Sequence, residues 1–155
     1  MSAPPDPDVG RVESELVVPF RHSLSHPIAR FLTGLRDRQL FGLQCTVCGG
    51  VHCPPAEVCA PCFARTSLWV ELPPRGWVKA FSVVRITFPG QPVPPPFVYA
   101  EIVIEGAANV LVHRVGGTDT DLPDAGVRVG QQVEAVWADE PAGSLLDIDH
   151  FRPIP

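Results

Sequence analysis

The chain lacks a long apolar run, although 45% of its 155 residues are hydrophobic. A helix that spans a bilayer needs roughly 20 consecutive apolar residues, so the sequence argues against a membrane-spanning segment. The first fifteen residues, MSAPPDPDVGRVESE, also lack the basic stretch and apolar core of a secretory signal peptide. We therefore expect a cytoplasmic protein, because a reducing compartment keeps cysteine thiols free.

Lysine and aromatic residues are scarce. Lys79 is the only lysine, aromatic residues make up 8% of the chain, and the net charge is −5. Nucleic-acid-binding proteins neutralise phosphates with a basic surface and stack bases on aromatic rings, so this composition argues against a nucleic-acid partner. The sequence also contains no glycine-rich phosphate loop and no GxSxG motif. These absences argue against two common classes of enzyme site.

Proline and glycine, in contrast, are abundant. Nineteen prolines and thirteen glycines favour short elements joined by many turns. The N-terminal stretch is rich in proline and acidic residues without periodicity, which predicts a flexible arm over residues 1–26.

An amphipathic helix is predicted over residues 27–40. Pro27 suits its first turn. Apolar residues recur with helical spacing at Ile28, Phe31, Leu32 and Leu35. This face either packs on its own domain or, through Phe31 and Leu35, docks on another subunit.

Two CxxC pairs separated by ten residues carry most of the information in the sequence. Their cysteines are Cys45, Cys48, Cys59 and Cys62. Each pair lets two sulfurs reach one ion from a single turn, and two such turns supply the tetrahedral thiolates of a closed structural Zn²⁺ site. Gly49 eases the turn after the first pair, whereas Phe63 makes the second turn less regular. Two disulfides, or one redox-active CxxC, are the alternative interpretation.

The segment around these cysteines predicts a rubredoxin-like zinc ribbon over about residues 41–69. Thirty residues bury too little surface to fold alone, so metal binding would supply about 10 kcal/mol of folding free energy. Cys53 and His52 fall out of step with the two pairs, and we expect a half-buried Cys53 and an exposed His52. Because all four metal positions are taken by protein, the ion would hold structure and take no part in chemistry.

The remainder predicts a mainly β domain over residues 73–155, after a helix-plus-ribbon unit over residues 27–72. Five β-rich segments are separated by turn residues at 77–88, 97–105, 109–115, 132–138 and 145–151. Five short strands in about 80 residues suit an OB-fold barrel, and an SH3-like barrel is the competing topology.

The order of these segments resembles the DUF35 family of zinc-ribbon/OB-fold proteins associated with acyl-CoA metabolism. The resemblance rests on LQCTVCGGVHCPPAEVCAPC, RGWVKAFSVV, PPPFVYAEIVIEG and the closing DHFRP, and it covers about residues 25–155. Ala56 departs from the family pattern, which usually has arginine after the Pro-Pro pair.

This resemblance implies a non-catalytic accessory subunit of a thiolase-like enzyme that acts on acyl-CoA thioesters. The narrowest version is a complex for retro-aldol cleavage of steroid side-chain CoA esters, in which the partner binds the acyl-CoA substrate and carries the catalytic residues. A stand-alone acyl-CoA-binding module is the second hypothesis, and a single-strand nucleic-acid binder is the third.

Candidates for chemistry within the chain are few. His113 lies in the middle of a predicted strand, where we expect a half-exposed side chain. Asp149 and His150 are neighbours in the last predicted strand, so they should point to opposite faces and form no compact pair.

A partner or ligand interface is predicted around the first barrel strands. The loop 89–97 is stiffened by prolines, which lose little entropy on docking. The alternative interpretation is that these prolines only form the turns between two strands. Basic residues near the barrel mouth could meet a CoA phosphate or an acidic partner, or be ordinary surface charge. The interface candidates here are Arg75, Lys79, Arg85, Val93, Pro95 and Phe97.

Overall fold

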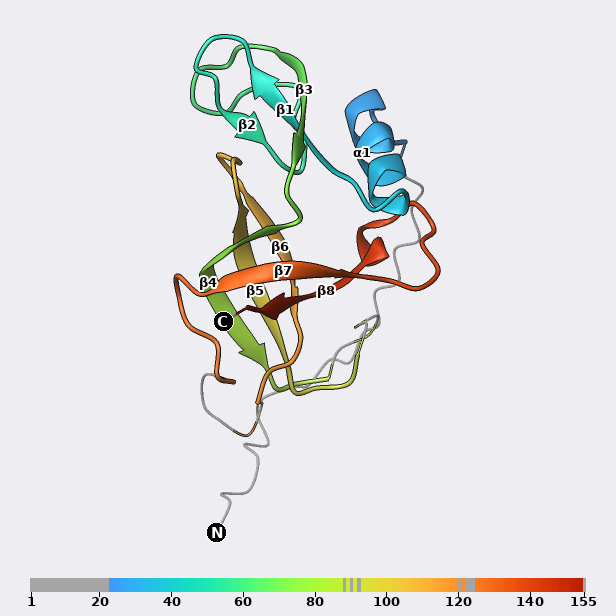
Figure 1. The fold of residues 1–155 in the computed structure, drawn as a ribbon, viewed down its shortest axis with the longest axis vertical. Coiled ribbons are helices and arrows are strands. Elements are labelled where there is room, and N and C mark those ends of the chain that lie inside the picture. The colour runs from blue at the N-terminus through green and yellow to red at the C-terminus, as the bar shows by residue number, and fades with distance from the viewer. Residues whose placement is uncertain are drawn as a thin grey trace, which may run out of the picture.

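The computed structural model describes residues 23–87, 89, 91, 93–119, 121 and 125–154. It confirms a mainly β protein with one helix, a small cysteine-bearing sheet and a closed five-stranded barrel. Figure 1 shows the sheet and the helix together at one end of the molecule, with the barrel below them. Most of the arm predicted over residues 1–26 falls outside the described residues.

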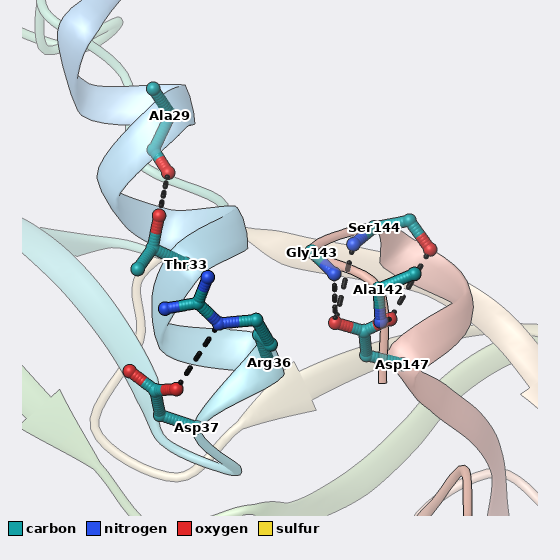
Figure 2. Close-up of polar contacts among 8 residues, drawn as sticks. All are labelled: Ala29, Thr33, Arg36, Asp37, Ala142, Gly143, Ser144 and Asp147. Atoms are coloured by element: carbon teal, nitrogen blue, oxygen red, sulfur yellow. Dashed lines mark hydrogen bonds and ion pairs between the residues drawn. The ribbon is translucent and has the colours of Figure 1, made fainter. Parts of the chain in front are cut away.

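Helix α1 spans His26–Arg36 and is shorter than predicted. The sequence places its end at residue 40, but Arg38 adopts a left-handed conformation with φ 60°, which reverses the chain. The amide of Gln39 then donates to the carbonyl of Gly34 at 2.8 Å and closes the helix end. Figure 2 shows the last turns, where the Thr33 hydroxyl donates to the Ala29 carbonyl and Arg36 pairs with Asp37.

The ribbon is a three-stranded antiparallel sheet in the order β2-β1-β3. Its strands are β1 (Leu40–Cys45), β2 (Val51–His52) and β3 (Thr66–Leu72). The helix packs on it through Arg30, whose guanidinium lies 4.4 Å from the Trp69 ring centroid and 5.9 Å from that of Phe41. A cation over an aromatic face is stabilising, so this contact helps to fix the helix on the ribbon.

The barrel confirms the OB-fold prediction. Its strands are β4 (Arg75–Val84), β5 (Phe97–Ile104), β6 (Val110–Val115), β7 (Gln132–Trp137) and β8 (Ile148–Pro153). They close in the order β4-β5-β6-β8-β7, with β6 parallel to β8 and every other pair antiparallel. This five-stranded Greek-key closure is the OB arrangement. The last strand begins at Ile148, because Leu145–Asp147 form a 3₁₀ turn, η1, where the sequence predicts strand.

Buried side chains form one continuous cluster from the helix through the ribbon to the barrel. It includes Phe31 and Leu35 of α1, Leu72 of β3 and Ile102 of β5. Burial of this apolar surface is the main stabilising contribution and holds the three parts together. Within the described residues, no helix is long and apolar enough to cross a membrane.

Candidate metal centre and barrel cavities

The two CxxC pairs converge at one end of the ribbon. The Sγ atoms of the four predicted ligands, Cys45, Cys48, Cys59 and Cys62, all lie within 4.8 Å of one another. The Cys45 and Cys62 sulfurs are 3.4 Å apart, and those of Cys48 and Cys59 are 3.5 Å apart. A disulfide requires about 2.05 Å, so the four thiols are free.

Two equivalent backbone turns aim these sulfurs inward. The Gly49 amide donates to the Cys45 carbonyl at 3.0 Å, and the Phe63 amide donates to the Cys59 carbonyl at 2.8 Å. Both turns need a left-handed residue after the second cysteine, with φ 73° at Gly49 and φ 56° at Phe63. Glycine adopts this conformation freely, whereas phenylalanine is strained there. The second turn therefore has the same geometry as the first, at a cost in strain.

The donor set fits a four-coordinate metal ion. Four sulfurs at about 2.3 Å from a tetrahedral centre would lie about 3.8 Å apart, close to the separations found here. Hydrogen bonds from the backbone N–H groups of Cys48 and Val47 lower the pKa of the Cys45 thiol, which favours the thiolate that a metal requires. Burial and hydrogen bonds to the other three thiols raise the pKa of Cys59, so the four sulfurs share their protons as one group. With four protein ligands, no position is left for water or substrate.

Cys53 and His52 take no part in this cluster. The Cys53 side chain is 0% exposed rather than half-buried as expected, and burial raises the pKa of its thiol to about 12. His52 is also buried, which corrects the expectation of an exposed side chain. Its position in β2 turns the ring into the structure, where its Nε2 has no hydrogen-bond partner among the described residues.

Two cavities lie side by side on the barrel wall formed by β4, β5 and β6. The first, of about 350 Å³, is lined by Val93, Tyr99, Val112, His113, Arg114, Leu145, Leu146 and Asp149. The second, of about 300 Å³, shares Tyr99 and Val112 with it and extends over Phe81 of β4. OB folds commonly bind ligands on this wall, between the first loop of the barrel and the loop before its last strand.

A third cavity, of about 340 Å³, lies where the helix, ribbon and barrel meet. Its lining is almost entirely apolar and comes from Leu24, Ile28, Phe31, Leu32, Pro54, Gly143, Ser144 and Leu145. Leu145 borders both this junction cavity and the first wall cavity, so the two are neighbours.

The η1 turn that carries Leu145 is fixed by a buried carboxylate. Asp147 is 2% exposed and accepts hydrogen bonds from the backbone amides of Ala142 and Gly143, both at 2.8 Å, and of Ser144 at 3.2 Å (Figure 2). The Ser144 hydroxyl in turn accepts from the Leu146 amide and completes a capping box. Asp147 is thus a structural residue that holds a wall shared by two cavities.

The predicted interface residues separate into three groups. Phe31 and Leu35 are buried in the common core, whereas Phe97 is buried outside it, with its ring centroid 5.3 Å from that of Tyr99. Two cations of β4 are paired across strands: Arg75 with Glu105 at 2.7 Å, and Lys79 with Glu101 at 3.7 Å. Each of these charges is therefore offset locally. Val93 lines the first wall cavity, while Arg85 and Pro95 lie in the loop region between β4 and β5.

Two further expectations about histidines are wrong. His113 is 7% exposed rather than half-exposed, because it faces the barrel interior, where its Nε2 lies 3.1 Å from the Leu145 carbonyl and desolvation lowers its pKa. Asp149 and His150 do form a compact pair, with 2.7 Å between Oδ2 and Nδ1. The Asp149 side chain is 50% exposed and that of His150 is 21% exposed. Hydrogen bonding by His150, together with the charge of Arg114, lowers the pKa of Asp149.

Known proteins are similar to this chain in sequence and in fold. A DUF35 domain-containing scaffold protein of Methanocaldococcus jannaschii is 33% identical to this chain over 99 residues, which are 63% of this chain and 67% of that protein. The chain belongs to the DUF35 family. The family model for the C-terminal OB-fold domain of ChsH2 matches residues 69–138, which include β4 to β7 of the barrel.

Two solved DUF35 structures are similar over most of the chain. One is described as the Ltp2-ChsH2(DUF35) aldolase, with 25% identity and a TM-score of 0.62 over 86% of this chain and 98% of that one. The other is a DUF35 protein of unknown function from Sulfolobus solfataricus, with 19% identity and a TM-score of 0.59 over 83% and 85%. The second likeness shows the fold alone.

Sequence reasoning missed several residues that shape this DUF35 site. Tyr99 and Val112 line both wall cavities from adjacent strands, and Leu145 and Leu146 of the η1 turn line the first. Strand periodicity predicts which face each residue occupies but not which strands are neighbours, and η1 lies in a segment predicted as strand. Asn109 connects the barrel to the ribbon, but the sequence predicts only that it lies in a hairpin turn.

Proposed function

We propose that this DUF35 chain is a non-catalytic accessory subunit that binds a thiolase-like enzyme acting on acyl-CoA thioesters. The observation that carries the proposal is the similarity to the Ltp2-ChsH2(DUF35) aldolase, whose DUF35 chain is matched over 98% of its length. The archaeal relative described as a scaffold protein supports the same role. The partner supplies the catalytic residues and the acyl-CoA site, and the DUF35 chain orders the partner or shapes its substrate channel.

The ion held by the four cysteines is proposed to be Zn²⁺. An all-thiolate tetrahedral set suits zinc, and a closed site gives the ion a structural role. When bound, zinc ties the two turns of the ribbon together. We expect one zinc ion per chain by elemental analysis, and loss of the ion in a Cys48→Ser/Cys62→Ser variant.

Polar groups near the cavities form hydrogen bonds and an ion pair that stabilise the barrel wall, which fits an accessory role. Asp147 caps the η1 turn, and Asp149 pairs with Arg114 at 2.7 Å. His113 contacts the Leu145 carbonyl. In this proposal these groups hold the barrel wall in shape, and none of them transfers a proton to substrate.

The narrower form of the proposal concerns the reaction of the complex. The aldolase description of the matched structure favours carbon–carbon bond cleavage, and retro-aldol cleavage of steroid side-chain CoA esters is the specific version we put forward. Turnover of β-hydroxyacyl-CoA esters with and without a steroid ring system would test it. Equal or better turnover of straight-chain esters would contradict the steroid assignment.

The wall cavities favour a second candidate function, an acyl-CoA-binding module that acts without a partner. Two adjoining cavities on the wall that OB folds use for ligands support it. Calorimetry with CoA and medium-chain acyl-CoA esters tests this candidate on the isolated chain. Saturable binding would favour it, and no heat of binding at millimolar ester would exclude it.

The accessory role is tested by co-expression with the thiolase-like protein encoded nearest to this chain, followed by size-exclusion chromatography. Co-elution in fixed stoichiometry is expected. Separate elution of two folded proteins would contradict the proposal.

A further inference from the structure

The barrel touches the ribbon through the turn between β5 and β6, residues 105–109. Strand β2 pairs with β1 on one side, and on its other side the Ala108 amide donates to the Val51 carbonyl at 2.7 Å. Figure 1 shows this turn reaching up to β2. The shortest strand of the ribbon is thus held between its own sheet and the barrel.

Asn109, the only asparagine in the chain, makes two side-chain hydrogen bonds across this junction. Its Oδ1 accepts a hydrogen bond from the Cys53 amide at 2.6 Å, and its Nδ2 donates to the Pro54 carbonyl at 3.3 Å. A carboxamide offers an acceptor and a donor on one planar group, so it can pair with both backbone groups at once. We name these two hydrogen bonds the Asn109 latch.

The barrel turn that carries the latch also lies near the first CxxC turn, at Gly50. A Cβ placed on Gly50 would lie 3.5 Å from the Cys48 sulfur and 3.5 Å from the Ala108 Cβ. The Gly50 carbonyl also accepts from the Cys45 amide at 2.9 Å. Gly50 therefore lies between the first CxxC turn and the barrel turn.

The elements that the latch connects also line the three cavities described above. Strands β5 and β6 carry Tyr99, Val112 and Arg114 to the wall cavities. Pro54, whose carbonyl the latch holds, is the ribbon residue that lines the junction cavity. The latch therefore joins the ribbon to two strands that line the wall cavities and to one residue that lines the junction cavity.

We propose that Asn109 is a positioning residue that makes the shape of these cavities depend on metal loading. The proposal rests on metal binding by the four cysteines. It extends the proposed accessory role, because metal loading would then regulate the cavities of the subunit. With metal bound, the first CxxC turn holds β2 in place and the latch is closed. When the metal leaves, the turn relaxes, the latch opens, and Pro54 and the β5–β6 hairpin lose their fixed positions.

Hydrogen–deuterium exchange on the full chain, zinc-loaded and after chelation, tests this coupling. In the wild type, chelation should speed exchange in the ribbon and in residues 97–115 by roughly tenfold or more, and change β7 and β8 much less. Asn109→Ala should keep one zinc per chain and the same Co²⁺ charge-transfer spectrum. Exchange at Cys53 and in the β5–β6 turn should already be roughly tenfold faster in its zinc-loaded form.

Gln44→Ala is the matched control, because the Gln44 amide donates to the Gly49 carbonyl within the ribbon and does not reach the barrel. It should leave exchange in residues 97–115 unchanged while zinc is bound. If Asn109→Ala does not fold, Asn109→Asp replaces it. Aspartate keeps the acceptor for the Cys53 amide but loses the donor to Pro54, so it should give an intermediate rate.

Three results would overturn the coupling. The first is unchanged exchange in residues 97–115 of the wild type on chelation. The second is an equal rise over the whole barrel, and the third is full metal-dependent protection in the Asn109 variants. Failure of the accessory role is a separate result, because it is seen as two separately eluting proteins while the exchange pattern of the isolated chain stays the same.

Discussion

Replacing Asp147 by asparagine should lower the free energy of unfolding by about 2–3 kcal/mol at pH 7. The carboxylate is almost fully buried and accepts three backbone amide hydrogen bonds (Figure 2). Asparagine keeps one oxygen acceptor and turns an NH₂ group toward backbone N–H donors, so at least one buried donor loses its partner. For a domain of this size, the midpoint of thermal unfolding should fall by about 5–10 °C.

The effect should depend on pH in a defined direction. Burial alone would raise the pKa of Asp147, but the amides of Ala142, Gly143 and Ser144 outweigh burial and lower the pKa below its ordinary value of 3.8. A depressed folded-state pKa stabilises the fold above the unfolded-state pKa of about 3.9. That stabilisation is lost as the pH falls through the folded-state value. The difference between wild type and Asp147→Asn should therefore be constant from pH 7 to about 5 and shrink below about 4.

Thermal unfolding of the zinc-loaded proteins, followed by circular dichroism, is a suitable assay. Asp139→Asn is the control, since Asp139 is exposed and lies in the same connection between β7 and β8. It should change the unfolding free energy by less than about 0.5 kcal/mol. If Asp147→Asn behaves like this control at pH 7, or if its effect persists undiminished at pH 3, the capping argument is refuted.

Three further predictions follow from single residues. Gly76→Ala should destabilise the barrel by about 3 kcal/mol or more, because its Cβ would lie 2.1 Å from the Val103 carbonyl oxygen; a variant that melts like wild type would contradict this. Phe63→Asn should raise the free energy of unfolding by about 0.5–1 kcal/mol with zinc retained, since asparagine tolerates positive φ and the Phe63 side chain is 83% exposed. A lower unfolding midpoint in denaturant would contradict strain at this turn. Cys53, buried with a pKa near 12, should resist iodoacetamide at pH 8 in the folded chain and react after unfolding, as peptide mass spectrometry can show.

Much of the fold could be predicted because its signals are local. The two CxxC pairs specify where four sulfurs must meet, and the β-branched segments identify the barrel strands within a few residues. The spacing of Phe31 and Leu35 gives a helix with a buried face. Its end at Arg36 was missed because the left-handed residue that follows the helix is usually glycine or asparagine. Here that residue is Arg38, which does not predict a helix end.

The cavities and the latch could not be predicted, because they depend on how distant segments meet. Val115 of β6 pairs with Phe151 of β8 in parallel, and this crossing brings the η1 turn and Leu145 to the same wall as Tyr99. Asn109 contacts residues more than fifty positions away. The compact Asp149–His150 pair was missed because ideal strand geometry places adjacent side chains on opposite faces, whereas these two meet at 2.7 Å.

Reconstitution of enzyme activity tests the accessory role most directly. The thiolase-like partner is assayed for acyl-CoA turnover while the zinc-loaded chain is added in increasing molar ratio. We expect a partner with little activity alone, a rise in turnover that stops at a fixed stoichiometric ratio, and no turnover by this chain alone. A partner that is soluble and fully active without the chain, and unchanged when it is added, would contradict the account.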